Sequence, residues 1–164
     1  MENIFLSIGS NIDDPLKNCL GLIEFLKNHS DISLKKCSSF YRTEPVGYKT
    51  QEWFINLCAG VSTSLDPFAL LNKCKEIEKA LGREKSSIRW GPRTIDIDIL
   101  FYDDLIFSSD ELTIPHPLLH TRRFVLVPLN EIAGNFMHPV LRKNVAELFA
   151  ELNDNAVVEK IDIV

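Results

Sequence analysis

Residues 89–99 read Arg-Trp-Gly-Pro-Arg-Thr-Ile-Asp-Ile-Asp-Ile, a basic turn followed by alternating isoleucine and aspartate. Because successive strand side chains point to opposite faces, the isoleucines are expected to face the core, and Asp96 and Asp98 a cleft. Asp-x-Asp alone is common on solvated strand faces. With Arg89 and Arg93 just upstream, the stretch predicts a site for a divalent cation and phosphate.

The segments upstream of this strand predict two helices. Asp14-Pro15 and Asp66-Pro67 are each an N-cap followed by proline at the first helical position, and apolar residues recur at helical spacing after both. Gly82 is expected to end the second helix. The remaining apolar segments predict strands at residues 3–8, 33–41, 53–64 and 95–101.

This β-α-β-β-α-β order predicts an α+β fold, a ferredoxin-like βαββαβ sandwich with helices on one face of a mainly antiparallel sheet. A C-terminal extension is expected to follow. Its predicted elements are a hairpin at 105–107 and 112–114, helices at 124–132 and 145–152, and a strand at 157–161. We expect residues 1–164 to form a single domain, since there is no linker or repeat.

Composition restricts the partners. A net charge of -5 argues against a broad nucleic-acid face, yet four of the five charged residues between positions 83 and 93 are basic, which suits a small anion. There is no basic and apolar leader and no apolar run of membrane-spanning length, so we expect a cytoplasmic protein without a membrane partner. A monomer is also expected. The four cysteines form no Cys-x-x-Cys pair and are expected to be reduced core thiols.

Three further motifs accompany residues 89–99: Gly9-Ser10-Asn11, the Ser-Ser-Phe-Tyr-Arg-Thr of residues 38–43, and Pro115-His116-Pro117. Together they resemble the 6-hydroxymethyl-7,8-dihydropterin pyrophosphokinase family, from near the N-terminus to about Leu129. The resemblance implies a small α+β enzyme of folate biosynthesis with ATP and the pterin as substrates. It would move the β,γ-pyrophosphoryl unit of ATP onto the pterin hydroxymethyl oxygen, releasing AMP, with two Mg²⁺ ions.

The resemblance also implies roles for individual residues. Asp96 and Asp98 would hold both Mg²⁺ ions and form the catalytic set together with Arg83 and Arg93. The residues implied around ATP are Glu78, Lys85, Arg89, Trp90, Arg93, Ile99, Thr113, His116 and Arg122. Those implied for the pterin are Thr43, Glu44, Pro45, Val46, Phe54, Asn56, Asp96 and Phe124.

The pterin set fits the chemistry of a flat heteroaromatic ring. Phe54 and Phe124 offer two faces for stacking, and the Asn56 amide both donates to and accepts from the ring edge. Without the resemblance, both phenylalanines would be assigned to the core and His116 to a structural turn. The glycine- and serine-containing loop of residues 83–92 is expected to be mobile and to close over the nucleotide.

Three positions depart from the family pattern. Lys85 stands where an arginine is often found, which keeps the charge and loses the planar fork. Lys75 replaces a neutral amide on the adenine side, and Phe54 replaces a tyrosine.

The same residues leave one other class of protein open and argue against two more. A non-catalytic ferredoxin-like module that binds a nucleotide or metabolite stays open, since fold alone does not decide function. An RNA-binding sheet would need exposed aromatics on a basic face, which the chain lacks. A P-loop kinase would need a Gly-x-x-x-x-Gly-Lys-Ser/Thr motif, which is absent.

Overall fold

The computed structural model describes residues 3–47, 50–82 and 94–163. Its main feature is a six-stranded sheet in which every pair is antiparallel. The order is β5 (Asp96–Tyr102), β1 (Ile4–Ser10), β4 (Phe54–Thr63), β3 (Phe40–Thr43) and β8 (Val158–Ile161), with β2 (Ile32–Cys37) also paired to β4. β5, β1, β4 and β2 therefore have the strand order of a ferredoxin-like fold, which confirms the predicted fold class.

The single strand predicted over residues 33–41 is wrong, because the chain breaks between β2 and β3. At the break the Ser38 hydroxyl accepts a hydrogen bond from the Cys58 backbone N–H at 2.9 Å, and Ser39 turns to the Glu131 carboxylate. Side-chain acceptors thus replace part of the backbone hydrogen bonding of the sheet. Serine hydroxyls readily form such bonds with backbone groups. Both strands still pair with β4, at its two ends.

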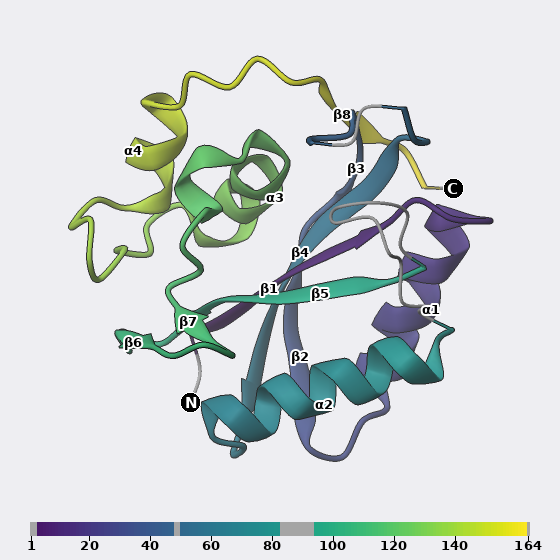
Figure 1. Cartoon of the computed structure of the whole chain (residues 1–164), viewed down its shortest axis with the longest axis horizontal. Coiled ribbons are helices and arrows are strands. Elements are labelled where there is room, and N and C mark those ends of the chain that lie inside the picture. The colour runs from purple at the N-terminus through teal and green to yellow at the C-terminus, as the bar shows by residue number, and fades with distance from the viewer. Residues whose placement is uncertain (1–2, 48–49, 83–93, 164) are drawn as a thin grey trace.

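The two predicted helices cover one face of the sheet (Figure 1). They are α1 (Pro15–Lys27) and α2 (Pro67–Ala80), and both form where the caps predict. Asp14 accepts a hydrogen bond from the Lys17 N–H at 3.1 Å, and Asp66 accepts one from the Ala69 N–H at 2.8 Å. Gly82 follows α2 with a φ of 90°, which glycine adopts without strain.

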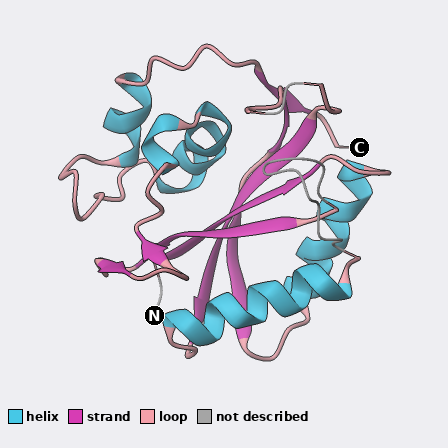
Figure 2. Cartoon of the chain, in the orientation of Figure 1, coloured by secondary structure: helices cyan, strands magenta, loops and turns pink. Residues whose placement is uncertain are grey.

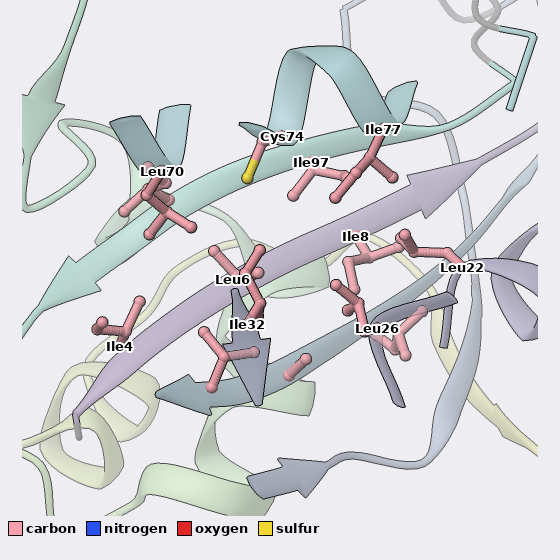
Figure 3. Packing of buried hydrophobic residues seen from close by; sticks show 14 of the residues in the cluster. Ile4, Leu6, Ile8, Leu22, Leu26, Ile32, Leu70, Cys74, Ile77 and Ile97 are labelled. Carbon is pink, nitrogen blue, oxygen red and sulfur yellow. The ribbon is translucent and has the colours of Figure 1, made fainter. Parts of the chain in front are cut away.

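Apolar side chains fill the space between these helices and the sheet. In Figure 3, Leu6 and Ile8 of β1 and Ile97 of β5 point toward Cys74 and Ile77 of α2 and toward α1. All of these side chains are almost fully buried. This core fixes which face of β1 and β5 is turned away from α1 and α2.

The C-terminal extension covers the opposite face. Its helices are α3 (Arg123–Ala133) and α4 (Val145–Ala150), which pack with Phe5, Cys58, Leu100 and Phe101 in a second apolar cluster. The two helix layers lie on either side of the strands in Figure 2. The sequence predicted both helices and did not place them on a face.

Short elements lead from β5 to α3. They are the hairpin β6 (Phe107–Ser108) and β7 (Thr113–Ile114), which was predicted, and the 3₁₀ turn η1 (Leu119–Thr121). Three of the predicted core cysteines are buried, whereas Cys37 is exposed at the end of β2. In the described part of the chain, no helix combines the length and the apolar character needed to cross a membrane.

Candidate functional site

The alternation predicted for β5 is confirmed. Ile95, Ile97 and Ile99 are buried in the core shared with α1 and α2. Asp96 and Asp98 are half-buried on the other face of the strand, the face that α3 covers. Two carboxylates at strand spacing therefore lie on the sheet face that is turned away from α1 and α2.

Residues from three strands line up beside these carboxylates. Gly9 of β1 is paired with Asp96 of β5 on one side and with Asn56 of β4 on the other. Thr43 of β3 is paired with Phe54 of β4, two residues along the strand from Asn56. Because paired residues share a face of the sheet, these side chains, far apart in sequence, form one floor.

Gly9 leaves room in the middle of this floor. A Cβ atom at Gly9 would lie 2.6 Å from Nδ2 of Asn56 and 3.7 Å from Cδ2 of Phe54. The Thr43 hydroxyl donates to Oδ1 of Asn56 at 2.5 Å, and Nδ2 of Asn56 donates to the Ile8 carbonyl at 3.4 Å. The Asn56 amide is thus buried, oriented and placed directly against a glycine.

The start of α3 lies over the same face of the sheet. The Cys58 thiol of β4 donates to the Val125 carbonyl of α3 at 3.7 Å, so this helix rests on the strand that carries Asn56. Arg122 precedes the helix, and its guanidinium is 5.5 Å from the centroid of the Phe124 ring. The structure therefore places Arg122 and Phe124 at the start of a helix that packs on the sheet face carrying Asn56.

Arg122 interacts with the carboxylate pair. Burial lowers the pKa of the Arg122 guanidinium, whereas the negative charges of Asp98 and Asp96 act in the opposite direction. A cation next to two like-charged carboxylates reduces their mutual repulsion. It also supplies the fork of donors that suits a phosphate group.

His116 is held as a neutral donor beside the same groups. Its backbone N–H donates to the Leu100 carbonyl at 2.9 Å, and its Nδ1 accepts from the Leu118 N–H at 3.1 Å. Burial and the charge of Arg122 lower the pKa of His116 to about 4, although Asp96 opposes this. At neutral pH the ring therefore carries its proton on Nε2, as a hydrogen-bond donor without a net charge.

Three other predicted nucleotide residues surround β5. Glu78 of α2 is buried, and its Oε2 accepts a hydrogen bond from the Ile97 N–H at 2.9 Å, between the two aspartates in sequence. The Ile99 side chain is also buried, so only its backbone is available to a nucleotide. Thr113 is half-buried in β7, and His116, just after this strand, is tied to β5.

The loop after β3 carries the remaining residues predicted for the pterin. Glu44 is half-buried, Pro45 is buried and Val46 is exposed. Asn11 ties this loop to the end of β1, because its Nδ2 donates to Oε1 of Gln51 at 2.8 Å and to the Glu52 carbonyl at 3.0 Å. Asn11 of the Gly9-Ser10-Asn11 motif thus connects the end of β1 to residues 51 and 52, just before β4.

Part of the predicted site is not described by the structure. Arg83, Lys85, Arg89, Trp90 and Arg93 lie outside the described residues, and so does the predicted mobile loop of residues 83–92. Within residues 3–47, 50–82 and 94–163, no three or more His, Cys, Asp or Glu side chains are grouped so as to hold a metal ion. The pair formed by Asp96 and Asp98 is therefore not part of a larger group of this kind among the described residues.

One link between α3 and the sheet has no counterpart in the sequence analysis. The Glu131 carboxylate of α3 accepts from the Tyr41 hydroxyl at 2.6 Å, from the Ser39 N–H at 2.7 Å and from the Ser39 hydroxyl at 3.1 Å. Burial raises the pKa of Glu131, but these hydrogen bonds outweigh it and the net pKa is lowered. A glutamate in an amphipathic helix looks solvated, so no sequence signal marks it.

We expect Glu131→Gln to lower the free energy of unfolding by about 1 kcal/mol at pH 7, because it weakens three charge-assisted hydrogen bonds at a partly exposed position. The Glu131 pKa is lower in the folded chain than its ordinary 4.5, so its stabilising effect is complete above that pH. The effect disappears as the pH falls through the folded pKa. Denaturant unfolding of both proteins at pH 7 and pH 3.5 measures this, and an equal gap at both pH values would contradict it.

Comparison with known proteins identifies the family. The model of the 7,8-dihydro-6-hydroxymethylpterin-pyrophosphokinase (HPPK) family matches residues 5–134. The chain belongs to this family. An HPPK relative from Bacillus subtilis, named 2-amino-4-hydroxy-6-hydroxymethyldihydropteridine pyrophosphokinase, is 42% identical over 80% of this chain and 79% of its own length. A protein of the same name from Methylorubrum extorquens is 40% identical over 99% of this chain and 100% of its own.

Solved structures share the HPPK fold. A Plasmodium falciparum HPPK-DHPS structure with pteroate superposes with a TM-score of 0.72 at 17% identity, covering 92% of this chain. A second HPPK-DHPS structure, in complex with substrates, gives a TM-score of 0.69 at 18% identity. The chain spans 42% and 43% of those two longer chains, and at such low identity the likeness concerns the fold alone.

Proposed function

We propose that this chain is the pyrophosphokinase that its family membership suggests, acting in folate biosynthesis. It would transfer the β,γ-pyrophosphoryl unit of ATP to the hydroxymethyl oxygen of 6-hydroxymethyl-7,8-dihydropterin, giving AMP and the pterin diphosphate. The observation that carries this proposal is the single row of Asp96, Gly9 and Asn56 across three strands. It puts a carboxylate suited to metal and phosphate chemistry beside a polar floor suited to a pterin.

The pterin is proposed to lie on this floor. The Asn56 amide, held by Thr43, would meet the polar edge of the ring, and the absence of a side chain at Gly9 lets this amide lie close to β1. Phe54 from the floor and Phe124 from α3 would stack on the ring faces. Pro45 and Val46, with the backbone of Glu44, would line the entrance.

The triphosphate is proposed to lie beside β5. Arg122 would bind phosphate oxygens through its fork of N–H groups, and His116 would donate from Nε2 without adding charge. Arg83 and Arg93 are proposed as the catalytic cations, with Lys85, Arg89 and Trp90 around the nucleotide. Glu78, Ile99 and Thr113 would complete the nucleotide site. Such groups accelerate phosphoryl transfer by positioning the substrates and stabilising charge.

Asp96 and Asp98 are the residues that would hold magnesium, and two ions are proposed. Their carboxylates share one face of β5, and hard cations of this kind bind through one or two carboxylates, with phosphate and water as the other ligands. Bound magnesium would neutralise phosphate charge and make the hydroxymethyl oxygen more acidic. The Arg122 guanidinium would offset part of the negative charge of the pair.

The wider setting is also a proposal. The chain is proposed to act as a single domain and a monomer in the cytoplasm, on small molecules, without a nucleic-acid or membrane partner. A net charge of -5 with locally clustered basic residues supports the small-molecule assignment.

One incubation tests the proposal. The protein is mixed with ATP, Mg²⁺ and 6-hydroxymethyl-7,8-dihydropterin, and AMP, ADP and pterin diphosphate are quantified together. We expect AMP and pterin diphosphate in equal amounts, with no ADP above the control without pterin. Joint binding of ATP and pterin without turnover would instead favour the alternative, a non-catalytic ferredoxin-like binding module.

A further inference from the structure

The two walls of the proposed pterin site lie on different elements, the sheet and the helix α3 that packs on it. Thr43, Phe54 and Asn56 are part of the sheet, whereas Phe124 is in the first turn of α3. The first N–H groups of a helix have no partner within the helix, and a local N-cap side chain commonly supplies one. Arg122 occupies the N-cap position of α3 and makes no such bond. The first turn therefore depends on an acceptor from elsewhere.

Asp154 supplies that acceptor from a distant part of the chain. Its Oδ2 accepts from the Arg123 N–H at 3.1 Å, and its Oδ1 accepts from the Ala156 N–H at 2.8 Å. A carboxylate at a helix N-terminus is also favoured by the helix dipole. Asp154 thus caps α3 at Arg123, the residue between Arg122 and Phe124.

The residues that follow Asp154 form hydrogen bonds with the other wall, at β3 and Glu44. The Val157 N–H donates to Oε1 of Glu44 at 3.0 Å, and the Glu44 N–H donates to the Val157 carbonyl at 3.1 Å. Pairing continues between β8 and β3, where Val158 lies opposite Thr43. We call residues 154–161 the C-terminal strap. In Figure 1 the chain crosses the top of the view from α4 to β8, next to β3.

The strap is short enough to restrict the distance between the walls. Asp154 and Val157 are three residues apart, so their Cα atoms are separated by at most about 11 Å. A flat ring stacked between two aromatic faces needs about 7–8 Å between those faces. The segment from Asp154 to Val157 is bonded to both walls, and its length is similar to the separation that two stacking faces would need. The strap also lies beyond residues 5–134, the part that the family model matches.

We propose that the C-terminal strap is a positioning element of the pterin site. By capping α3 through Asp154 and pairing with Glu44, it sets the separation and relative orientation of the walls that carry Phe124 and Thr43. This inference rests on the proposed function, because it takes the space between these walls as the pterin site. Asp154 would act through α3 and touch neither substrate.

Asp154→Ala tests the positioning role. We expect the KM for the pterin to rise about tenfold while kcat at saturating pterin stays within about threefold, since the cap orients a binding wall and no reacting group. Asp154→Asn keeps an oxygen that accepts from Arg123 and should restore most of the affinity. The matched control is Glu151→Ala, which removes a carboxylate three residues away that forms an exposed ion pair with Lys143 at 2.7 Å. It should leave the pterin KM unchanged.

Direct binding separates this inference from the proposed function. Pterin affinity is measured by fluorescence in the presence of an unreactive ATP analogue, which requires no turnover. Weaker pterin binding by Asp154→Ala supports the positioning role of the strap even if wild-type protein forms no AMP. If Asp154→Ala lowers the melting temperature and binds pterin as tightly as wild type, the strap is only structural and the inference fails.

A second variant covers the case in which Asp154→Ala does not fold. Val157→Pro removes the N–H that donates to Glu44 and leaves the α3 cap in place. We expect the same selective loss of pterin affinity, together with faster hydrogen exchange of the amides of Thr43, Glu44 and Val46. Wild-type pterin affinity in this variant would overturn the inference.

Discussion

Asp98→Asn is expected to reduce the turnover of ATP and pterin to AMP by at least about 10²-fold, the usual loss when one main electrostatic contact to a phosphoryl transition state is removed. Asparagine keeps the shape of the side chain but is a poorer ligand for a hard cation. The fold should be retained, because asparagine keeps the shape of this half-buried side chain, and the relief of repulsion from Asp96 opposes the loss of attraction to Arg122.

Two measurements distinguish loss of metal binding from loss of structure. Without ligand, Asp98→Asn should melt close to the wild-type temperature. With Mg²⁺ and an ATP analogue at about 100 times the wild-type Kd, wild type should gain about 2.7 kcal/mol of stability, and the variant much less. Asp104→Asn, the same change at an exposed position just after β5, is the control and should behave as wild type. Near-normal activity of Asp98→Asn would remove the metal assignment.

Gly9→Ala is expected to raise the KM for the pterin at least about tenfold, equivalent to about 1.4 kcal/mol. The added Cβ would stand 2.6 Å from Nδ2 of Asn56, closer than non-bonded atoms approach. Asn56 is buried and accepts from Thr43, so it cannot move away without breaking that bond. Overpacking of this kind also costs about 1–3 kcal/mol of stability.

Gly21→Ala provides a control within the same chain. Gly21 lies in α1 with no neighbouring atom within 4 Å of an added Cβ, so alanine there should raise helix stability by about 0.5–1 kcal/mol without affecting turnover. Steady-state kinetics with each substrate varied separately, plus thermal unfolding, compares the two variants. The KM for ATP should change little in Gly9→Ala. If its KM for the pterin equals that of wild type, the row through Gly9 and Asn56 is not the pterin floor.

Much of the fold followed from local patterns. The Asp-Pro caps placed both helices of the sandwich, and alternation in residues 95–99 correctly assigned Ile97 to the core and Asp98 to the opposite face. These succeeded because capping and alternation depend on neighbours in sequence. The break between β2 and β3 escaped prediction because the groups that replace the backbone ladder, the Cys58 N–H and Glu131, are distant in sequence.

The residue types of the candidate site were predicted from motifs and from the family resemblance, whereas their arrangement was not. Only the register of three strands shows that Gly9 separates Asp96 from Asn56. Only packing of α3 on β4 places Arg122 where the charges of both aspartates act on it. No local pattern in the sequence connects these groups, because Gly9 is 47 residues from Asn56 and 87 from Asp96, and Arg122 is 24 residues from Asp98.

The sequence by itself determined the chemistry available to this protein: two carboxylates on one strand face, basic residues beside them, and aromatic and amide groups for a flat ring. Tertiary structure alone decided how those groups are held, through Gly9 under Asn56, Glu131 against Tyr41, and Asp154 on the first turn of α3. The physical reason is one of range. Side-chain identity and strand or helix periodicity are local properties. The partner of a long-range hydrogen bond, or the residue that packs against a glycine, is decided only when distant segments pack together.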